Sequence, residues 1–346
     1  MESPLFQKLK KLWDSNSPFV SFRMPSATEA TVYFQKNERL HLTEDLNCNG
    51  FLMAPFDTKS QIPFIPNEFS ERFEWSITSR SAQIQPELNL DSKNKDSFKD
   101  LVKKAKRSIA FGKIKKVVLS QTQELPSRRC VVSIFEDLLN RYPLAMVYLW
   151  HHPSVGTWFG ASPEQFINSK LNFTQTMALA GTQVFDESTT PFWSAKEIEE
   201  QELVAIQVEK DLKILFTTDQ IQKSLTTNHR AGNLVHLCTY FQFPKLNNNI
   251  LKVANALHPT PAVGGVPKRT AQEFIFANEP HDRSFYTGFL GPTNATDTQL
   301  FVNLRCARWT KKTTTLYIGA GITQGSDPEK EWVELERKAK TLAKVL

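Results

Sequence analysis

Short apolar runs follow one another in the middle of this 346-residue chain, with turn residues and no helix between them. They occupy residues 145–150, 157–160, 165–168 and 173–180, and a second series occupies 284–291, 299–309 and 313–319. Each run predicts a strand, because apolar and β-branched residues bounded by Gly, Pro, Asn and Ser are typical of strands. Strands that come in series, and not in strict alternation with helices, predict an α+β fold with largely antiparallel sheets packed with helices.

Helical patterns separate and follow these series. We expect helices over 98–110, 133–141, 195–216, 250–257, 270–276 and 327–345, the second opened by a capping box of Ser133 and Glu136. Residues 116–125 predict a strand, and 233–241 a strand or a short mixed element. Residues 1–95 show only short strands and loops without a chemical motif. We interpret them as a variable N-terminal part of the same fold, with the chemistry in 96–346.

Composition disfavours several classes of protein. No apolar run is long enough to span a bilayer, and the first 22 residues lack a signal-peptide core, so we expect a cytoplasmic protein with no membrane partner. The four cysteines lack the spacing of a zinc or redox motif, and free buried thiols are expected. The net charge of +6 allows a nucleic-acid partner, but the basic cluster at 103–107 fits a solvated helix face better. A basic enzyme would also suit an anionic small substrate.

Two of the expected helices carry acids on their apolar faces. On a helical wheel, Glu197 and Glu200 continue the apolar stripe of the helix at 195–216, and Glu331 and Glu334 continue that of the last helix. Unpaired buried carboxylates are costly, so four of them suggest a hard cation with oxygen ligands, such as Mg²⁺. The alternative is that both helix starts protrude into solvent and hold acids through the helix dipole.

Three other positions are candidates for a site, each with an ordinary alternative. Arg305 falls on the opposite face of its strand from the apolar residues, where it would enter a site or lie on the surface. The glycines at 319 and 321 permit either close approach to a ligand or tight packing. Lys116 opens an apolar strand, where burial would make it a base, whereas an exposed strand end would leave it an ordinary lysine.

The ordered set of motifs resembles the chorismate-utilising enzymes, which include isochorismate synthases, salicylate synthases and the large subunits of anthranilate and aminodeoxychorismate synthases. The matching blocks are KVVLS (116–120), GASPE (160–164), LAGT (179–182), KEIEE (196–200), VHL (235–237), LHPTPAVGG (257–265) with Pro267, YTG (286–288), LR (304–305), GAGI (319–322) and SDPEKEW (326–332). Any one block is weak, but the set in this order is specific and spans about residues 97–346. The resemblance implies the anthranilate synthase component I-like fold and a chorismate-binding catalytic region.

The resemblance also implies an acid and a base. Lys116 resembles the general base that activates water, and Glu164 resembles the general acid that protonates the departing hydroxyl. Water must add at one ring carbon of chorismate while a hydroxyl leaves another, which needs both groups. Lys116 must then be substantially neutral and Glu164 protonated, and desolvation favours both states.

The remaining candidates resemble groups that hold the metal and the substrate. Glu200 and Glu334 resemble direct Mg²⁺ ligands, with Glu197 and Glu331 beside them, partly through water. Because chorismate carries two carboxylates, a metal ion and cationic side chains would neutralise it. The residues that resemble substrate-binding or pocket-lining positions are Gly181, Thr182, His236, Ala262, Tyr286, Arg305, Gly321 and Lys338.

Within the family, particular residues favour one branch. Ala180 stands where aminodeoxychorismate synthases often carry a nucleophilic lysine, which argues against that branch. Anthranilate synthases typically lack a lysine at the position of Lys116, which argues against that branch too. Ala262 stands where salicylate synthases often have Thr, so isochorismate synthase is favoured over salicylate synthase or a catalytically silent chorismate-binding protein. Gln121 and Leu335 depart from the usual Arg and Thr of the family.

Assignment to the isochorismate synthase branch also leads to expectations about partners. We expect a monomer or weak dimer, no glutaminase subunit and no nucleic acid. The product would feed menaquinone or siderophore biosynthesis, menaquinone being the more general destination.

Overall fold

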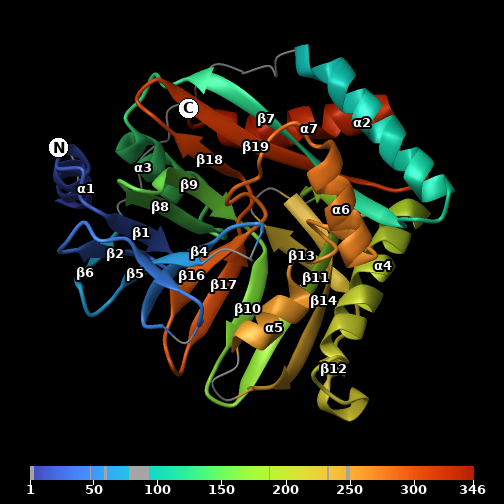
Figure 1. The fold of residues 1–346 in the computed structure, drawn as a ribbon, viewed down its shortest axis with the longest axis horizontal. Helices are drawn as coiled ribbons and strands as arrows, with labels where there is room; N and C mark the ends of the chain where they lie inside the picture. The colour runs from blue at the N-terminus through green and yellow to red at the C-terminus, as the bar shows by residue number, and fades with distance from the viewer. Residues whose placement is uncertain are drawn as a thin grey trace.

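The computed structural model describes residues 4–46, 48–57, 61–77, 93–186, 188–231, 234–246 and 250–346. Within these ranges the strands form two sheets in which every pairing is antiparallel, so the predicted α+β class is confirmed (Figure 1). The first sheet, in spatial order, contains Gly265–Val266 (β15), Lys116–Pro126 (β7), Thr313–Ile322 (β19), Cys306–Trp309 (β18), Gly156–Ser162 (β9), Met146–His152 (β8), Phe19–Arg23 (β1), Glu29–Gln35 (β2) and Ser70–Ser76 (β6).

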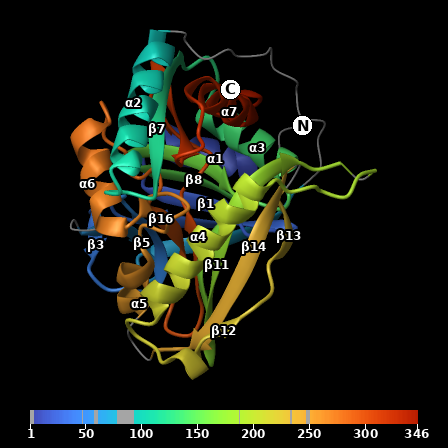
Figure 2. The same ribbon diagram turned by 90° about the vertical axis from the view of Figure 1, so that its right-hand side faces the viewer.

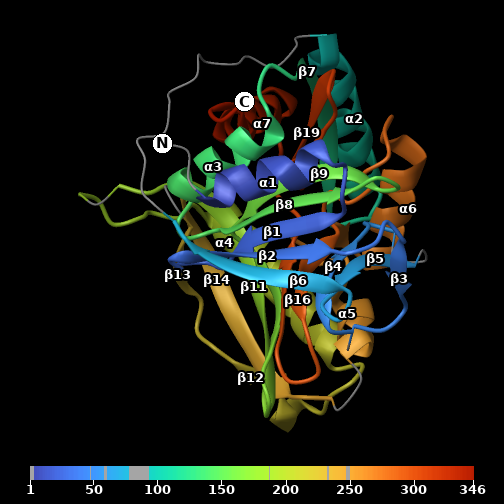
Figure 3. The ribbon, with the colours of Figure 1, turned by 90° about the vertical axis from the view of Figure 1, so that its left-hand side faces the viewer.

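The second sheet collects strands from the beginning, middle and end of the chain. Its order is Gln222–Lys223 (β12), Leu234–Pro244 (β14), Phe173–Val184 (β11), Gln165–Ser169 (β10), Thr298–Val302 (β17), Phe289–Thr293 (β16), Gly50–Ala54 (β4), Ile62–Pro66 (β5) and His41–Thr43 (β3), with Thr227–Ala231 (β13) also paired to β14. In Figure 3, β1, β2 and β8 of the first sheet run across the view, whereas β11 and β14 of the second run along its height.

Helices cover the outer faces of both sheets. They are Pro4–Asp14 (α1), Lys93–Ala110 (α2), Val131–Arg141 (α3), Ala195–Leu212 (α4), Ile250–Leu257 (α5), Lys268–Asn278 (α6) and Pro328–Ala343 (α7), with a short 3₁₀ turn at Thr218–Gln220. The apolar faces of α1, α2, α3 and α7 pack on the first sheet, and those of α4 and α5 pack on the second. Figure 2 shows α4 lying along β11 and β14.

A third apolar cluster fills the space between the sheets. Phe22 and Trp150 of the first sheet contact Phe51 of the second, with ring centroids 4.8 and 6.3 Å apart. Burying both faces of each sheet explains why β8 is inaccessible along its whole length instead of alternating between buried and exposed residues. The layers are therefore helices, sheet, sheet and helices.

The N-terminal prediction of strands and loops alone is wrong at its start. Pro4–Asp14 is a helix, because Phe6, Leu9 and Leu12 recur at three-residue spacing and bury one face, which packs on α3. The strands β1 to β6 that follow join both sheets. The division at residues 95 and 96 stays a prediction.

Two expected strands differ from the structure near the carboxyl end. Residues 299–309 were predicted as one strand, but β17 ends at Val302 in the second sheet and β18 begins at Cys306 in the first. The break occurs because Asn303 turns inward, its Oδ1 accepting from Tyr148 Oη at 2.8 Å, and Arg305 adopts a φ of +47°. Of the strand predicted over 284–291, only the part from Phe289 is extended, since positive φ angles at Ser284 and Thr287 form a turn before it.

The predicted helices are present in the structure, but several begin or end at other residues than predicted. The capping box predicted from Ser133 and Glu136 is wrong, because the buried Val131 and Val132 extend α3 backwards and Cys130 becomes its N-cap without a side-chain bond. The helix predicted to residue 216 ends at 212. Cys238 and Cys306 are buried, Cys48 and Cys130 are half-buried, and all four are free thiols. No helix among the described residues has the length and hydropathy needed to cross a bilayer.

Candidate active site

A cavity of about 980 Å³ lies where β7 and β19 of the first sheet meet β11, β14 and the helices α4 and α7. Its lining comes from segments that are far apart in the sequence. Every predicted site residue except Glu331 lines it, namely Lys116, Glu164, Gly181, Thr182, Glu197, Glu200, His236, Ala262, Tyr286, Arg305, Gly321, Glu334 and Lys338. The fold thus brings the predicted residues into one place.

Lys116 is the first residue of β7 and only 1% of it is exposed, so the alternative of an exposed strand-end lysine is wrong. Its Nζ lies 2.9 Å from Oε1 of Glu200 on α4. Gly321, on the paired strand β19, makes room for this contact, since a Cβ there would lie 3.0 Å from Glu200 Oε1 and 3.2 Å from Lys116 Cε. The contact is that of an ammonium and a carboxylate, and differs from the neutral amine that the expected base requires.

Glu164 lies in the short link between β9 and β10 and is 4% exposed. Burial raises the pKa of this carboxyl to about 7, although the nearby charge of Lys116 lowers it in part. A carboxyl with a pKa near neutrality is protonated in a large fraction of molecules, which is the state that a general acid needs.

His236 is a neutral imidazole, and one of its two ring nitrogens is hydrogen-bonded within the protein. Its Nδ1 lies 3.0 Å from the carbonyl oxygen of Gly181, so Nδ1 carries the proton and donates it, and Thr182 Oγ1 lies 3.1 Å away. Burial, followed by the charge of Arg305, lowers the pKa of His236 to about 3. Its Nε2 is buried without a protein partner and so offers a lone pair to a hydroxyl donor in the cavity.

Two cationic side chains, Arg305 and Lys338, line the same cavity. Within the described ranges no carboxylate pairs with Arg305, and burial lowers the pKa of this guanidinium. Lys338 pairs with Glu334 at 2.7 Å and donates to the carbonyl oxygen of Gly319 at 2.9 Å. A half-buried arginine that lines a cavity and has no carboxylate partner among the described residues is suited to bind a carboxylate of a ligand. The alternative of a surface arginine is therefore wrong.

The four predicted metal ligands have different surroundings. Glu197 closes a capping box at the start of α4 and accepts from Ser194 N at 2.9 Å, while Glu200 and Glu334 are paired with lysines. Glu331, three residues before Glu334 on α7, is buried but does not line the cavity. No three His, Cys, Asp or Glu side chains in the described parts of the chain are gathered closely enough to hold a metal ion. The Mg²⁺ site stays a prediction.

Comparison with known proteins identifies the family. Residues 46–346 match the sequence profile described as "Chorismate binding enzyme". The chain belongs to this family. It is 29% identical to isochorismate synthase DhbC of Bacillus subtilis over 279 residues, which cover 72% of this chain and 68% of the relative. It is also 29% identical to isochorismate synthase MenF of Escherichia coli over 293 residues, 79% of this chain and 67% of the relative.

Solved structures of similar proteins share the fold of this chorismate-binding enzyme. The menaquinone-specific isochorismate synthase MenF of Escherichia coli matches with a TM-score of 0.78 at 21% identity, over 95% of this chain and 88% of the other. Anthranilate synthase component I of Streptococcus pneumoniae matches with a TM-score of 0.74 at 16% identity, over 94% and 90% of the two chains. The predicted family, its likeness to isochorismate synthases and the component I-like fold are confirmed.

The cavity of this chorismate-binding enzyme also includes residues that were not predicted as site residues. Tyr317 lies four residues before Gly321 on β19, so the two-residue period of a strand could have identified it. Tyr317 stacks on Tyr286 with ring centroids 5.6 Å apart. Arg337 on α7 is exposed yet contributes to the cavity lining.

Proposed function

We propose that this enzyme is an isochorismate synthase, an isomerase that converts chorismate to isochorismate. The observation that carries the proposal is the presence of the buried Lys116 and of Glu164, with its pKa of about 7, in the lining of one cavity. The names of the relatives support the same assignment. The product would feed menaquinone or siderophore biosynthesis.

The proposed reaction uses these two residues for proton transfer. Lys116 removes a proton from water as the water oxygen bonds to a ring carbon of chorismate, and the ring double bonds shift. Glu164 protonates the departing hydroxyl, which leaves as water. Arg305 and Lys338 hold the two substrate carboxylates, and Nε2 of His236 accepts a hydrogen bond from a substrate hydroxyl.

We further propose that the enzyme uses Mg²⁺. Glu197, Glu200 and Glu334 offer carboxylate oxygens to one cavity from two helices, and oxygen is the donor that this ion prefers. Glu200 and Glu334 would hold the ion after exchanging their lysine partners for it, with Glu197 and Glu331 acting partly through water. When bound, the ion would neutralise substrate carboxylate charge.

We propose that the enzyme works without a glutaminase subunit, because water is the nucleophile and no ammonia has to be supplied. We also propose that it is a monomer or weak dimer and that it works in the cytoplasm.

The product decides the assignment. Purified enzyme with chorismate and Mg²⁺ should form isochorismate, measured by coupling to isochorismatase, and a lactate-dehydrogenase assay should detect little pyruvate near neutral pH. Pyruvate formed in step with chorismate loss would identify a salicylate synthase instead. Failure to consume chorismate would identify a binding protein.

A further inference from the structure

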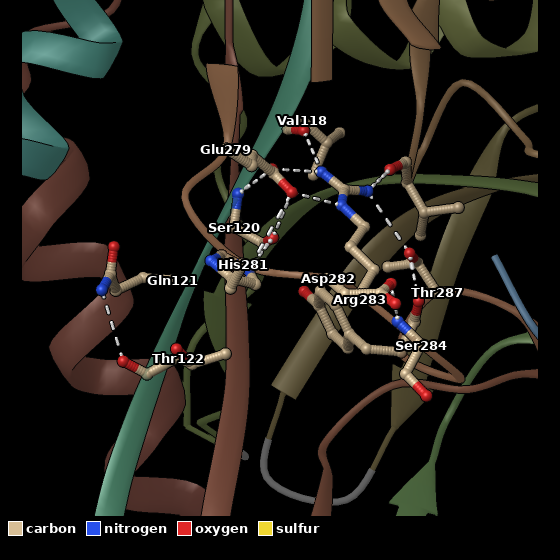
Figure 4. Close-up of polar contacts among 12 residues, drawn as sticks. Val118, Ser120, Gln121, Thr122, Glu279, His281, Asp282, Arg283, Ser284 and Thr287 are labelled. Atoms are coloured by element: carbon tan, nitrogen blue, oxygen red, sulfur yellow. Dashed lines mark hydrogen bonds and ion pairs between the residues drawn. The ribbon is translucent and has the colours of Figure 1, made fainter. Parts of the chain in front are cut away.

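A buried ion pair lies behind the cavity lining and is not part of the proposed proton transfers. Glu279 ends α6, and Arg283 follows four residues later in the loop, with 2% of each side chain exposed. Arg283 donates from Nη2 to Glu279 Oε1 at 2.6 Å and from Nε to Oε2 at 2.8 Å. This two-pronged contact, visible in Figure 4, fixes the plane of the guanidinium.

The guanidinium also reaches three separate segments. Arg283 Nη2 donates to the carbonyl oxygen of Val118 at 2.6 Å, and Nη1 donates to that of Val263 at 3.0 Å and to Thr287 Oγ1 at 3.3 Å. The ring of Phe56 lies 4.6 Å from the guanidinium carbon and covers it. Figure 4 shows the contacts of Arg283 with Val118 and Thr287.

Glu279 holds one of these segments a second time. It accepts from Ser120 N at 2.7 Å and from Ser120 Oγ at 2.9 Å. Ser120 and Val118 both belong to β7, the strand that begins with Lys116. The pair therefore fixes β7 at two points, both within four residues of the proposed base.

The segments joined in this way are walls of the cavity. Val118 and Val263 line it themselves, Ala262 precedes Val263, and Tyr286 precedes Thr287. One guanidinium thus sets the position of the Lys116 strand, of the loop with Ala262 and of the turn with Tyr286 relative to one another.

A catalytic role for the neighbouring serine and histidine is excluded by their hydrogen bonds. His281 Nε2 lies 2.9 Å from Ser120 Oγ, which resembles a nucleophile and its base. Ser120 is fully buried, and its hydroxyl donates to Glu279 because an ionised carboxylate can only accept. His281 must then donate to Ser120 and cannot remove its proton. The cluster is a support and not a second active site.

We propose that Arg283, held by Glu279, is a positioning residue for the chemical step, an inference that rests on the proposed function of the cavity. Buried ion pairs add little net stability compared with apolar replacements. Their fixed geometry, in contrast, places reacting groups, and a displacement of about 1 Å is able to lower a rate by roughly a hundredfold.

The test separates positioning from stability. In the double variant Arg283→Met with Glu279→Gln, the glutamine keeps an acceptor for Ser120 N and the buried charges are gone. We expect a melting temperature within a few degrees of wild type, a kcat lowered roughly tenfold or more, and a KM that changes by less than about threefold. The readout is chorismate consumption, which does not depend on the identity of the product.

A matched control lies on the same helix. Arg269 and Glu273 form an ion pair with the same four-residue spacing but with side chains 91% and 60% exposed, so Arg269→Met with Glu273→Gln should leave kcat unchanged. Arg283→Lys is the second test, because a lysine keeps the charge opposite Glu279 but cannot reach all the acceptors of the guanidinium. The Arg283→Lys variant should also have a lowered kcat. If the double variant does not fold, the kcat of Arg283→Lys alone tests whether Arg283 is a positioning residue.

The proposal is overturned if either folded variant retains the kcat of wild type, or if only KM rises. Failure of the proposed function is a separate result, since it would appear as a different product, or no reaction, with the wild-type enzyme.

Discussion

Nζ of Lys116 lies 2.9 Å from Oε1 of Glu200, so the proposed base and a proposed magnesium ligand are partners in this structure. Only 1% of the lysine side chain is exposed, against 20% of the glutamate. A metal ion bound to this carboxylate would compete with the positive charge of the lysine for it. Metal binding and release of the lysine are therefore expected to be linked, which makes metal removal and substitution of Lys116 informative experiments.

Removal of divalent metal should abolish turnover. EDTA-treated enzyme should regain activity with Mg²⁺, and calorimetry should detect Mg²⁺ binding that is lost in Glu200→Gln and in Glu334→Gln. Glu202→Gln is the matched control, because Glu202 lies on the exposed side of the same helix as Glu200. Full activity in metal-free enzyme would contradict the proposed role of the ion.

Substitution of Lys116 should affect the chemical step more than substrate binding. Lys116→Ala should lower kcat by roughly 10²-fold or more, the usual scale for an acid–base group. KM should change less, since Arg305 and Lys338 still face the substrate carboxylates. Steady-state kinetics would measure both.

Lys116→Arg separates a base from an electrostatic residue. Arginine keeps the charge but cannot act as a neutral base, so this variant should be as inactive as the alanine variant while still binding chorismate. A kcat close to that of wild type would show that Lys116 acts through its charge alone.

The pH dependence of kcat/KM should report Glu164. A general acid must be protonated, and its pKa is about 7, so kcat/KM should fall as pH rises through about 7. Glu164→Gln should lower kcat roughly 10²-fold and remove this limb of the profile. A wild-type profile that stays flat between pH 6 and pH 8 would argue against Glu164 as the acid.

The stability of the protein should show the same preference for protonated Glu164. Burial raises the pKa of Glu164 from 4.5 to about 7, so the folded state binds more protons than the unfolded state between these values. The wild-type free energy of unfolding should therefore fall, relative to that of Glu164→Gln, as pH rises from 4.5 to 7, by at most roughly 3 kcal/mol. Urea denaturation of both proteins at pH 5 and pH 8 would measure the difference.

Gly321→Ala should displace the Lys116–Glu200 pair. The added Cβ would lie 3.0 Å from Glu200 Oε1, which is closer than most such contacts. We expect kcat/KM to fall at least tenfold, on the roughly hundredfold scale of a small misplacement. Gly325→Ala is the control, because nothing lies within 4 Å of the position its Cβ would take. Equal kinetics in the two variants would show that the space at Gly321 has no role.

Features that depend on one element could be predicted from the sequence. The acids at Glu197 and Glu200 face the cavity because helical periodicity alone sets their side. The burial of Lys116 follows from the apolar strand it begins, although its partner Glu200 does not. Family resemblance alone supplied other predicted lining residues, such as Glu164, His236 and Tyr286.

Features that depend on distant partners could not be predicted in this way. The strand expected over 299–309 breaks because Asn303 binds Tyr148 and the carbonyl oxygen of Phe285, contacts that no local pattern contains. The Glu279–Arg283 pair was missed for the same reason, since its acceptors lie on β7 and near Val263. The helix α1 did have a local signal, in the spacing of Phe6, Leu9 and Leu12.

The pairing of β7 with β19 has a consequence for synthesis of the enzyme. Val117 pairs with Ile322, so a strand made in the first half of the chain acquires its neighbour only when the last part has left the ribosome. Until then one edge of an apolar strand has no partner, and such edges promote association between nascent chains. Chains that stop before β19 would therefore lack both the cavity and the protection of that edge, and are expected to aggregate or to be degraded instead of accumulating as inactive protein.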